Sequence, residues 1–296
     1  MSAPPAQRAP DAVLSIQSAV ACGHVGNSAA TLPLQRLGFD VLAVNTVLLA
    51  HHPGHGRWRG HKVAPAEIAE ILLGLEQHGV LGRCAAVVSG YLGDPAVADL
   101  VLRAVAAVRA ARPDALYLCD PVIGDDHSGV FVAAGIPERM QKDLVPAADL
   151  VTPNRFELAR LTGQEVADLP TALAASAALR ARGPRLVVAT GLPLPDRPDA
   201  LGVLAETADE AWLVTTPRRP VALGGTGDAF SALLLGHYLR GRDLRHALER
   251  AVSAVFALVE RSCEQGANEL PLVALQDQLA TPSVRFAAAP ARPDAG

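Results

Sequence analysis

Short apolar runs alternate with longer segments of helical period along most of the chain. The runs are aliphatic and bounded by turn residues, as buried parallel strands are, and the segments between them repeat apolar residues every three or four positions, as helices do. Strands that alternate with helices predict an α/β fold with a mostly parallel sheet and right-handed crossovers. The predicted strands cover residues 13–17, 41–45, 85–89, 116–120, 150–152, 186–190, 202–206 and 211–215.

Helices are predicted between and after these strands. The segment 228–239 is apolar almost all round and predicts a buried helix, whereas 244–262 follows Asp243, a natural N-cap. The strands 202–206 and 211–215 are joined by turn residues and predict a hairpin at a sheet edge. The remaining predicted helices cover 28–37, 65–78, 95–110, 135–143, 155–162 and 170–181.

Polar residues stand where the apolar strands run out. In an open parallel sheet the carboxyl ends of the strands gather along one edge, and ligands bind at that edge. Side chains that are scattered in sequence are therefore expected to converge in space. These residues are Ser18, Asn45, Ser89, Asp120, Asn154 and Thr190.

Length and composition fit one large domain with two tails. A chain of 296 residues is long enough for a single α/β domain, and 50% hydrophobic residues can fill its core. We predict this domain over residues 12–280. Residues 1–11 predict a disordered N-terminal tail, and the Ala- and Pro-rich residues 281–296 predict a flexible C-terminal tail.

Charge and cysteine usage exclude several classes of protein. The net charge is -4 without a long basic run, so no nucleic-acid partner is expected. No apolar stretch reaches membrane-spanning length and the chain begins without a signal peptide, so no membrane contact is expected. The four cysteines are isolated and lack zinc spacing, which favours reduced thiols and a cytoplasmic location.

A glycine-rich turn leads directly into the predicted buried helix, in the sequence Gly224-Gly225-Thr226-Gly227-Asp228. Glycines let successive amides point inward, and the first turn of a helix adds unpaired donors and partial positive charge, which suits a phosphoryl group. Asp228 could accept the proton of an attacking hydroxyl beside these amides. The alternative is an ordinary turn with a capping aspartate; the turn lacks the P-loop pattern GxxxxGK[ST].

Two further acidic motifs follow predicted strands. Asn154 and Glu157 lie three residues apart at a helix start, where they could hold a hydrated Mg²⁺ that bridges ATP phosphates. A capping box is the alternative that the spacing favours. Asp120, with Asp125 and Asp126 nearby, could serve the metal and nucleotide side or form a solvated turn.

Two more segments are candidates for substrate contact. Ser18, at the end of the first strand, could hydrogen-bond a heteroaromatic ring. Residues 51–61 are rich in His and Gly, match no metal-ligand spacing and predict a mobile lid anchored by Trp58 that keeps water from the phosphoryl donor.

With these motifs assembled, the chain resembles the pyridoxal kinases, a branch of the ribokinase-like superfamily, from about residue 13 to residue 280. The GTGD and DPV motifs are shared across the superfamily, whereas the SGYLG run and the IQS...GHVGNSAA start are narrower. The resemblance is carried by residues 16–18, 23–30, 45–47, 89–93, 119–125, 152–158 and 225–228.

The resemblance implies a three-layer α/β/α fold and a set of roles for these residues. Pyridoxal would lie near Ser18, Thr46 and the lid, with Asp228 as catalytic base and Gly225, Thr226 and Gly227 as the anion hole. ATP would meet Asp120, Asn154, Glu157 and Thr190, and Mg²⁺ would be held by Asp120 and Glu157. It also implies a homodimer and a monovalent cation such as K⁺.

Two other functions remain open at this point. A hydroxymethylpyrimidine kinase would share the phosphoryl-transfer site and differ in the ring pocket. A non-catalytic homologue that binds pyridoxal phosphate would keep the fold without turnover. Asp228 favours an enzyme, because a binder would be free to lose it, and here it stands in an intact glycine turn.

Overall fold

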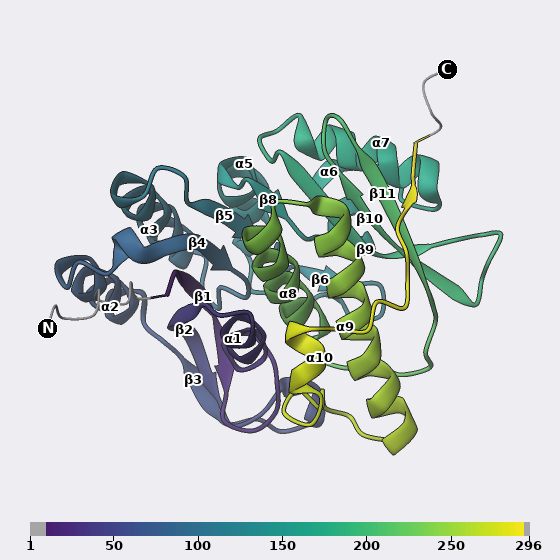
Figure 1. Ribbon diagram of the computed structural model, residues 1–296. Helices are drawn as coiled ribbons and strands as arrows, with labels where there is room; N and C mark the ends of the chain where they lie inside the picture. The colour runs from purple at the N-terminus through teal and green to yellow at the C-terminus, as the bar shows by residue number, and fades with distance from the viewer. Residues whose placement is uncertain (1–9, 293–296) are drawn as a thin grey trace, which may run out of the picture.

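The computed structural model describes residues 10–292 and consists of one ten-stranded sheet between two layers of helices (Figure 1). This confirms the predicted three-layer α/β/α fold with a mostly parallel sheet. Most of the predicted N-terminal tail and residues 293–296 of the predicted C-terminal tail lie outside the described residues. Because one sheet carries strands from both ends of the chain, we propose a single domain that extends to residue 292.

The sheet has a parallel centre and antiparallel margins. Six strands run parallel in the order β2-β1-β4-β5-β8-β9, whereas β3 and the run β10, β11 and β12 are antiparallel to their neighbours. All the predicted strands are present, together with short ones that carry no apolar pattern. The strands are β1 (Ala12–Val20), β2 (Asp40–Leu49), β3 (Gly60–Lys62), β4 (Cys84–Ser89), β5 (Leu116–Cys119), β8 (Leu150–Val151), β9 (Leu186–Pro193), β10 (Ala200–Glu206), β11 (Ala211–Pro217) and β12 (Ala289–Pro290), with a separate hairpin of β6 (Gly124–Asp125) and β7 (Gly129–Val130).

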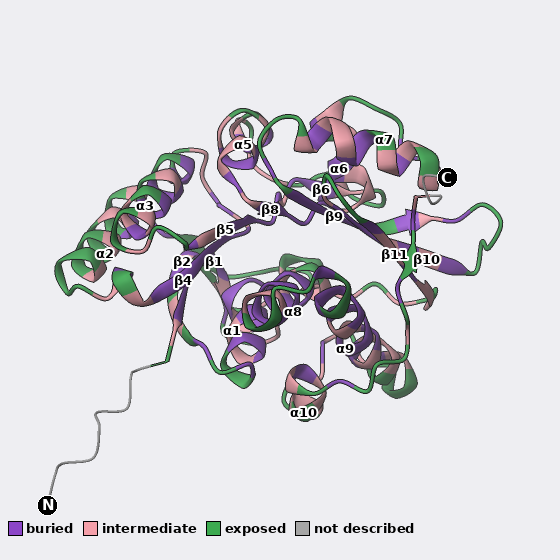
Figure 2. Cartoon of the chain, turned by 45° about the horizontal axis from the view of Figure 1, so that its top comes forward, coloured by how far each residue is buried: buried purple, intermediate pink, exposed green. Residues whose placement is uncertain are grey.

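Helices cover both faces of the sheet and turn their buried sides toward it (Figure 2). One layer holds α1 (Asn27–Arg36), α8 (Thr226–Gly241), α9 (Leu244–Gln265) and α10 (Gln276–Ala280). The other holds α2 (Pro65–Gln77), α3 (Val97–Ala111), α4 (Ile136–Arg139), α5 (Val145–Ala147), α6 (Arg155–Thr162) and α7 (Leu169–Arg180). Among the described residues, none of these helices is both long and apolar enough to cross a bilayer.

Helices α8 and α9 form as the sequence predicts. Every residue from Ala229 to His237 in α8 is buried, since this helix lies between α1 and α9 as well as against the sheet. Asp243 caps α9, and its side chain accepts a hydrogen bond from the amide of His246 at 2.9 Å. The predicted helix 135–143 is α4 followed by a π-helical turn, η3 (Met140–Leu144).

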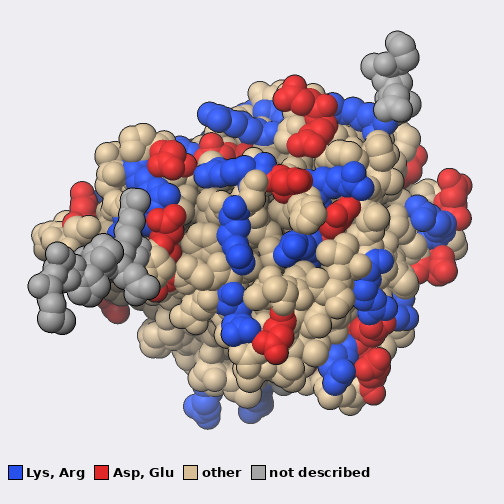
Figure 3. All heavy atoms as spheres, in the orientation of Figure 1, with Lys and Arg blue, Asp and Glu red and all other residues tan. Residues whose placement is uncertain are grey.

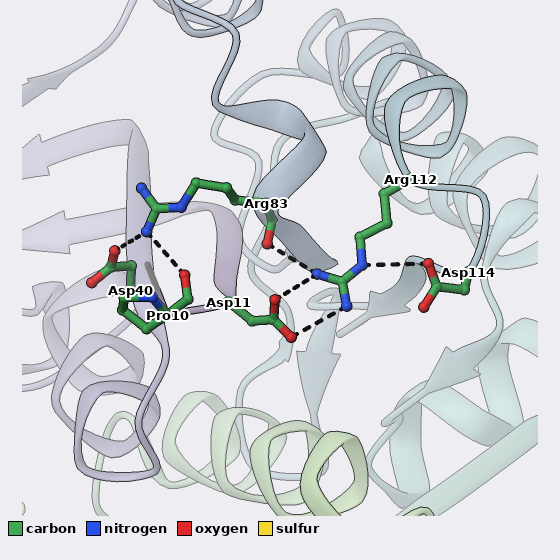
Figure 4. A network of polar contacts seen from close by, with 6 residues as sticks. All are labelled: Pro10, Asp11, Asp40, Arg83, Arg112 and Asp114. Carbon is green, nitrogen blue, oxygen red and sulfur yellow. Dashed lines mark hydrogen bonds and ion pairs between the residues drawn. The ribbon is translucent and has the colours of Figure 1, made fainter. Parts of the chain in front are cut away.

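The first described residues are held in place by arginines from two other elements (Figure 4). Arg112 binds both carboxylate oxygens of Asp11, at 2.9 and 3.2 Å, just before β1 begins. Arg83 donates to the carbonyl oxygen of Pro10 at 2.9 Å and also pairs with Asp40 at the start of β2. Pro10 and Asp11, which we predicted as part of the tail, therefore contact the domain, and we propose that the domain includes them.

The segment 281–292 also differs from the predicted tail, because it lies against the domain. Its β12 pairs with β11 through Trp212 and Leu213, and the amide of Ala288 donates to Glu249 at 2.9 Å. Arg285 and Arg292 form ion pairs with Glu260 and Glu206. Acidic and basic groups are interspersed over the face seen in Figure 3. Backbone pairing and ion pairs hold this segment, so its sequence shows no apolar period.

We expect Arg292→Ala to lower stability. Glu206 is 2% exposed and pairs with Arg292 and, at 3.5 Å, with Arg180, so the substitution removes a partner from a buried carboxylate. Such losses cost about 1 to 3 kcal/mol. Urea denaturation monitored by circular dichroism measures the change. The matched control is Arg36→Ala, whose partner Asp277 is 89% exposed, and a loss no larger than the control's would contradict a stabilising role for the segment.

Candidate active site

The predicted site residues converge at the carboxyl edge of the sheet, but several lie inside strands rather than after them. The pairing of β1 with β2 shifts between Gln17 and Ala19, at Ser18, and on β2 the same irregularity contains Thr46. The pairing of β9 with β10 shifts beside Thr190. Bulges of this kind re-aim side chains and are common next to active sites. The strands therefore continue past the residues at which the sequence predicted their ends.

Two glycine-containing turns pack against each other at this edge. Gly225 is the N-cap of α8 with φ 82°, and a Cβ there would collide with the carbonyl oxygen of His24 in the turn after β1. Gly26 in that turn has φ 54°, and a Cβ there would collide with Ser18. Both positions require glycine. The close approach directs the first turn of α8, with its amide donors and partial positive charge, at the edge where the polar residues gather.

Asp228 is the third residue of α8 and remains only partly exposed. Burial of its carboxyl group raises its pKa, and hydrogen bonds from the amides of Gly26 and of Asp228 itself act in the opposite direction. The side chain thus lies where the two glycine turns meet. A carboxylate whose pKa is raised is a better proton acceptor than a free aspartate, which suits a general base.

Asp120 follows β5 and faces the first turns of α8. Its Oδ2 accepts a hydrogen bond from the Ser231 hydroxyl at 3.1 Å and lies 3.9 Å from the position that a Cβ on Gly227 would occupy. The Ser231 hydroxyl in turn lies 2.8 Å from the hydroxyl of Thr152, which follows β8. All three polar side chains are buried. This chain of hydrogen bonds joins the ends of two strands to α8.

Asn154 and Glu157 form the capping box that their spacing favours. The Asn154 Oδ1 accepts from the amide of Glu157, and the Glu157 Oε2 accepts from the amide of Asn154, both at 2.9 Å. The Glu157 Oε1 accepts from the amides of Ile123 at 2.9 Å and Gly124 at 3.4 Å. Thr190 forms a parallel bridge with Asn154. Both oxygens of Glu157 are therefore engaged by backbone amides.

The carboxylates at this edge repel one another. Burial raises the pKa of Asp120 well above its ordinary value, and the charges of Glu157 and Asp228 raise it further. Burial likewise raises the pKa of Glu157 to about 7, against the opposing effect of its three amide hydrogen bonds. Negative charge is thus concentrated here, and no cationic side chain is among the groups that shift these two pKa values. Oxygen ligands and unbalanced negative charge suit a divalent cation such as Mg²⁺.

A full protein cage for a metal is absent from the described residues, which contain no group of three or more His, Cys, Asp and Glu side chains arranged to hold one ion. This also holds for the side chains of the His-rich segment that the structure describes. Mg²⁺ is commonly bound by one or two carboxylates, waters and substrate phosphates, so the donor set at Asp120 and Glu157 fits that ion.

The substrate side of the site is formed by β1, β2 and the predicted lid. Ser18 and Thr46 are both buried, and the Thr46 hydroxyl donates to the carbonyl oxygen of Tyr91 at 2.6 Å. His52 lies beside Gly224, since its Nδ1 is 3.5 Å from the position of a Cβ on that glycine. Trp58 is 51% exposed and does not anchor the lid here. The last two lid residues, Gly60 and His61, instead belong to β3, which pairs with the end of β2.

Several residues of this edge were not identified from the sequence. Ser231 stands in an apolar helix, and nothing in the local pattern marks it. The amides of Gly26, Ile123 and Gly124 contact the acidic side chains through their backbone, so their side chains carry no signal. Glu269 accepts from the amide of His24 at 3.1 Å across the whole length of the chain. Only the glycines in the turn after β1, such as Gly26, could have indicated a close approach of two backbone segments.

Comparisons with known proteins relate the chain to small-molecule kinases. The model of the phosphomethylpyrimidine kinase family matches residues 73–273. A pyridoxal kinase PdxY of Rubrobacter xylanophilus is 50% identical over 93% of this chain and 95% of its own length. A pyridoxal kinase PdxY of Leifsonia xyli is 48% identical over 93% and 98%.

Solved structures give the same result. The pyridoxal kinase of Leishmania donovani in complex with ADP and pyridoxamine is 34% identical, with a TM-score of 0.88, over 94% of this chain and 98% of that one. The same enzyme in complex with ADP and ginkgotoxin has a TM-score of 0.89 at 33% identity, over 95% of this chain and 99% of that one. The likeness extends over nearly the whole chain.

Proposed function

The chain belongs to the pyridoxal kinase family, and we propose that it transfers the γ-phosphoryl group of ATP to the 5′-hydroxymethyl group of pyridoxal with Asp228 as the base. The activity, pyridoxal kinase with ATP as co-substrate, follows from the family. The roles of individual residues are our proposal. The observation that carries it is the position of Asp228 in the first turn of α8, beside the glycine turn and across from Asp120.

The proposed reaction proceeds by in-line transfer at the start of α8. Asp228 accepts the proton of the hydroxymethyl group as its oxygen attacks the γ-phosphorus. The amides of Gly225, Thr226 and Gly227 donate to the equatorial oxygens of the transferring group, on which negative charge is spread. The bond between the γ-phosphorus and the oxygen that bridges it to the β-phosphate breaks, and ADP leaves with that oxygen. The partial positive charge at the start of α8 stabilises the negative charge of the transferring group throughout.

We propose that Asp120 and Glu157 hold the Mg²⁺ of Mg-ATP, with Asn154 and Thr190 on the nucleotide side. Mg²⁺ neutralises charge on the phosphates. Because the Glu157 oxygens accept three amide hydrogen bonds, Glu157 would contribute its negative charge to the ion through bound water. We also propose that K⁺ supports turnover. Measuring the rate of turnover in K⁺ and in Na⁺ tests this.

For the acceptor, we propose that the ring of pyridoxal lies by Ser18 and Thr46, and that residues 51–61 close over it. Hydroxymethylpyrimidine is the second candidate acceptor, because the matching family model is named for phosphomethylpyrimidine kinase. The pyridoxal kinase relatives match over more of the chain and favour pyridoxal. The Leishmania donovani complexes with ADP and pyridoxamine or pyridoxine favour a pocket that accepts several B6 vitamers.

We further propose a cytoplasmic homodimer that uses the margin of the sheet at β2 and α2. Ile71 on α2 is 46% exposed, and Leu48 on β2 is 42% exposed. β3 pairs only with residues 47–49 of β2, so the earlier part of that strand has an open edge among the described residues. A second copy would cover this apolar margin. Light scattering on Ile71→Glu and on the parent protein measures the expected loss of the dimer.

The experiment that tests the function compares four acceptors in one assay with Mg-ATP. Purified protein is supplied with pyridoxal, pyridoxamine, pyridoxine or hydroxymethylpyrimidine, and formation of ADP and of the phosphorylated product is measured. We expect pyridoxal to be converted to its 5′-phosphate. Faster turnover of hydroxymethylpyrimidine than of any B6 vitamer would favour the second candidate, and binding without turnover would favour a non-catalytic homologue.

A further inference from the structure

The hydroxyl groups of Ser231 and Thr152 form a buried connection to Asp120. The Ser231 Oγ donates to the Asp120 Oδ2 at 3.1 Å, and a serine hydroxyl has only one proton to donate. The contact of 2.8 Å between Ser231 and Thr152 must then be donated by Thr152. The hydrogen bonds therefore run in one direction, from Thr152 through Ser231 to the carboxylate.

The connection ties three separate elements together. Thr152 follows β8, Asp120 follows β5, and Ser231 lies on α8. Their exposed fractions are 5%, 5% and 3%, so water does not compete for these hydrogen bonds. The amide of Thr152 also donates to the carbonyl oxygen of Cys119 at 3.2 Å, which keeps the ends of the two strands side by side. Buried hydrogen bonds to a charged acceptor are among the stronger ones in proteins.

The position of Ser231 on α8 gives this connection a functional consequence. Ser231 lies three residues after Asp228, so the two side chains lie on the same side of the helix. A hydrogen bond from Ser231 to Asp120 therefore sets the distance between Asp120 and Asp228. In the proposed reaction these two groups serve the metal-bound nucleotide and the attacking hydroxyl, and small errors in their spacing are costly.

We propose that Ser231 is a positioning residue for phosphoryl transfer: it holds Asp120 in register with Asp228, and Thr152 holds Ser231. The inference rests on the proposed function of this site. Ser231 touches neither substrate nor nucleotide in it, since its hydroxyl is used by Asp120 and Thr152. Its removal should impair the use of Mg-nucleotide and leave binding of pyridoxal unchanged.

The first test measures binding, apart from turnover. ADP affinity is determined by calorimetry with and without Mg²⁺ for the parent protein, Ser231→Ala and Thr152→Val. We expect the gain in ADP affinity caused by Mg²⁺ to fall about tenfold in Ser231→Ala, as for the loss of a hydrogen bond to a charged group, and less in Thr152→Val. Pyridoxal affinity should stay within about twofold in both. An unchanged Mg²⁺ effect in Ser231→Ala would overturn the inference.

A matched control separates positioning from loss of packing. Ser253 on α9 is 1% exposed, and its hydroxyl accepts from the amide of Arg285 at 3.1 Å, far along the sequence from the acidic residues. Ser253→Ala also removes one buried helical hydroxyl and should leave the Mg²⁺ effect intact. Ser231→Thr keeps the hydroxyl and should retain most of the effect. An equal loss in Ser253→Ala would point to stability alone and overturn the inference.

The double variant provides the final test. If Thr152 acts only through Ser231, then Ser231→Ala with Thr152→Val should be no worse than Ser231→Ala alone. Additive losses in Mg²⁺-dependent ADP affinity and in kcat would mean independent roles and would contradict the proposal. Parent protein that fails to phosphorylate any B6 vitamer would defeat the proposed function instead. If the parent protein is active and the variants behave like it, only the proposed positioning role is contradicted.

Discussion

Asp228→Ala is expected to abolish turnover of pyridoxal while changing substrate binding little. A positioned general base contributes about 10²- to 10⁴-fold to the rate, and the described site offers no other carboxylate in the first turn of α8. The loss should appear in kcat, because the base acts on the transferring proton rather than on the bound ring. Initial rates of pyridoxal 5′-phosphate formation, with calorimetric binding of ADP and pyridoxal, measure both quantities.

Replacing the Asp228 carboxylate by a neutral side chain should not destabilise the fold. Folding raises the pKa of Asp228, so the ionised carboxylate disfavours the folded state at pH values above its unfolded pKa. Asp228→Asn should therefore keep or slightly raise the melting temperature at neutral pH while it removes activity. Asp209→Ala, in the exposed turn before β11, is the control for loss of one acidic residue. Asp228→Asn turning over at near the parental rate would refute the assignment of the base.

Gly225→Ala is expected to have the second largest effect, and here activity and stability should fall together. With φ 82°, Gly225 has a backbone conformation that strains any other residue, and an added methyl group would collide with the carbonyl oxygen of His24. The turn must then shift, which moves its amides away from the phosphoryl group. The loss of one such donor costs about 10²- to 10³-fold in kcat.

Gly241→Ala is the matched control, since it changes a glycine at the other end of the same helix. A Cβ on Gly241 would have no atom within 4 Å, and its φ is not positive. Alanine is the better helix former by up to about 1 kcal/mol, so this variant should be neutral or slightly more stable. Thermal denaturation and initial rates measure both variants. If Gly225→Ala kept full activity, the glycine turn would not be the anion hole.

The central strands and the main helices could be predicted because burial leaves a local signature. Strands such as β4 and β5 are covered on both faces, so they read as continuous apolar runs bounded by turns. The start of α6 is determined by a capping box whose two members lie three residues apart, and its predicted bounds match the structure. Interactions within one turn of helix or one strand can be predicted in this way.

Short strands, and the continuation of long strands past a polar residue, could not be predicted because they depend on a partner strand and leave no local pattern. β3 and β12 are exposed and have two or three residues, so no period develops, and both depend on a neighbouring strand. β1 and β9 continue past Ser18 and Thr190 through shifts in pairing, although the polar residue there resembles a strand end. Whether a polar residue ends a strand or forms a bulge depends on the partner strand.

The order of the elements, the edge of the sheet where polar groups gather and the glycine turn before α8 could all be predicted from the amino-acid sequence. Each is a property of neighbouring residues or of strand direction. The contacts that these polar groups make depend on the packing of the folded chain. Glu157 is engaged by backbone amides of Ile123 and Gly124, and Asp120 is held by Ser231. Asp120 and Ser231 are 111 residues apart, and such contacts arise from packing of α8 against the sheet rather than from any local pattern.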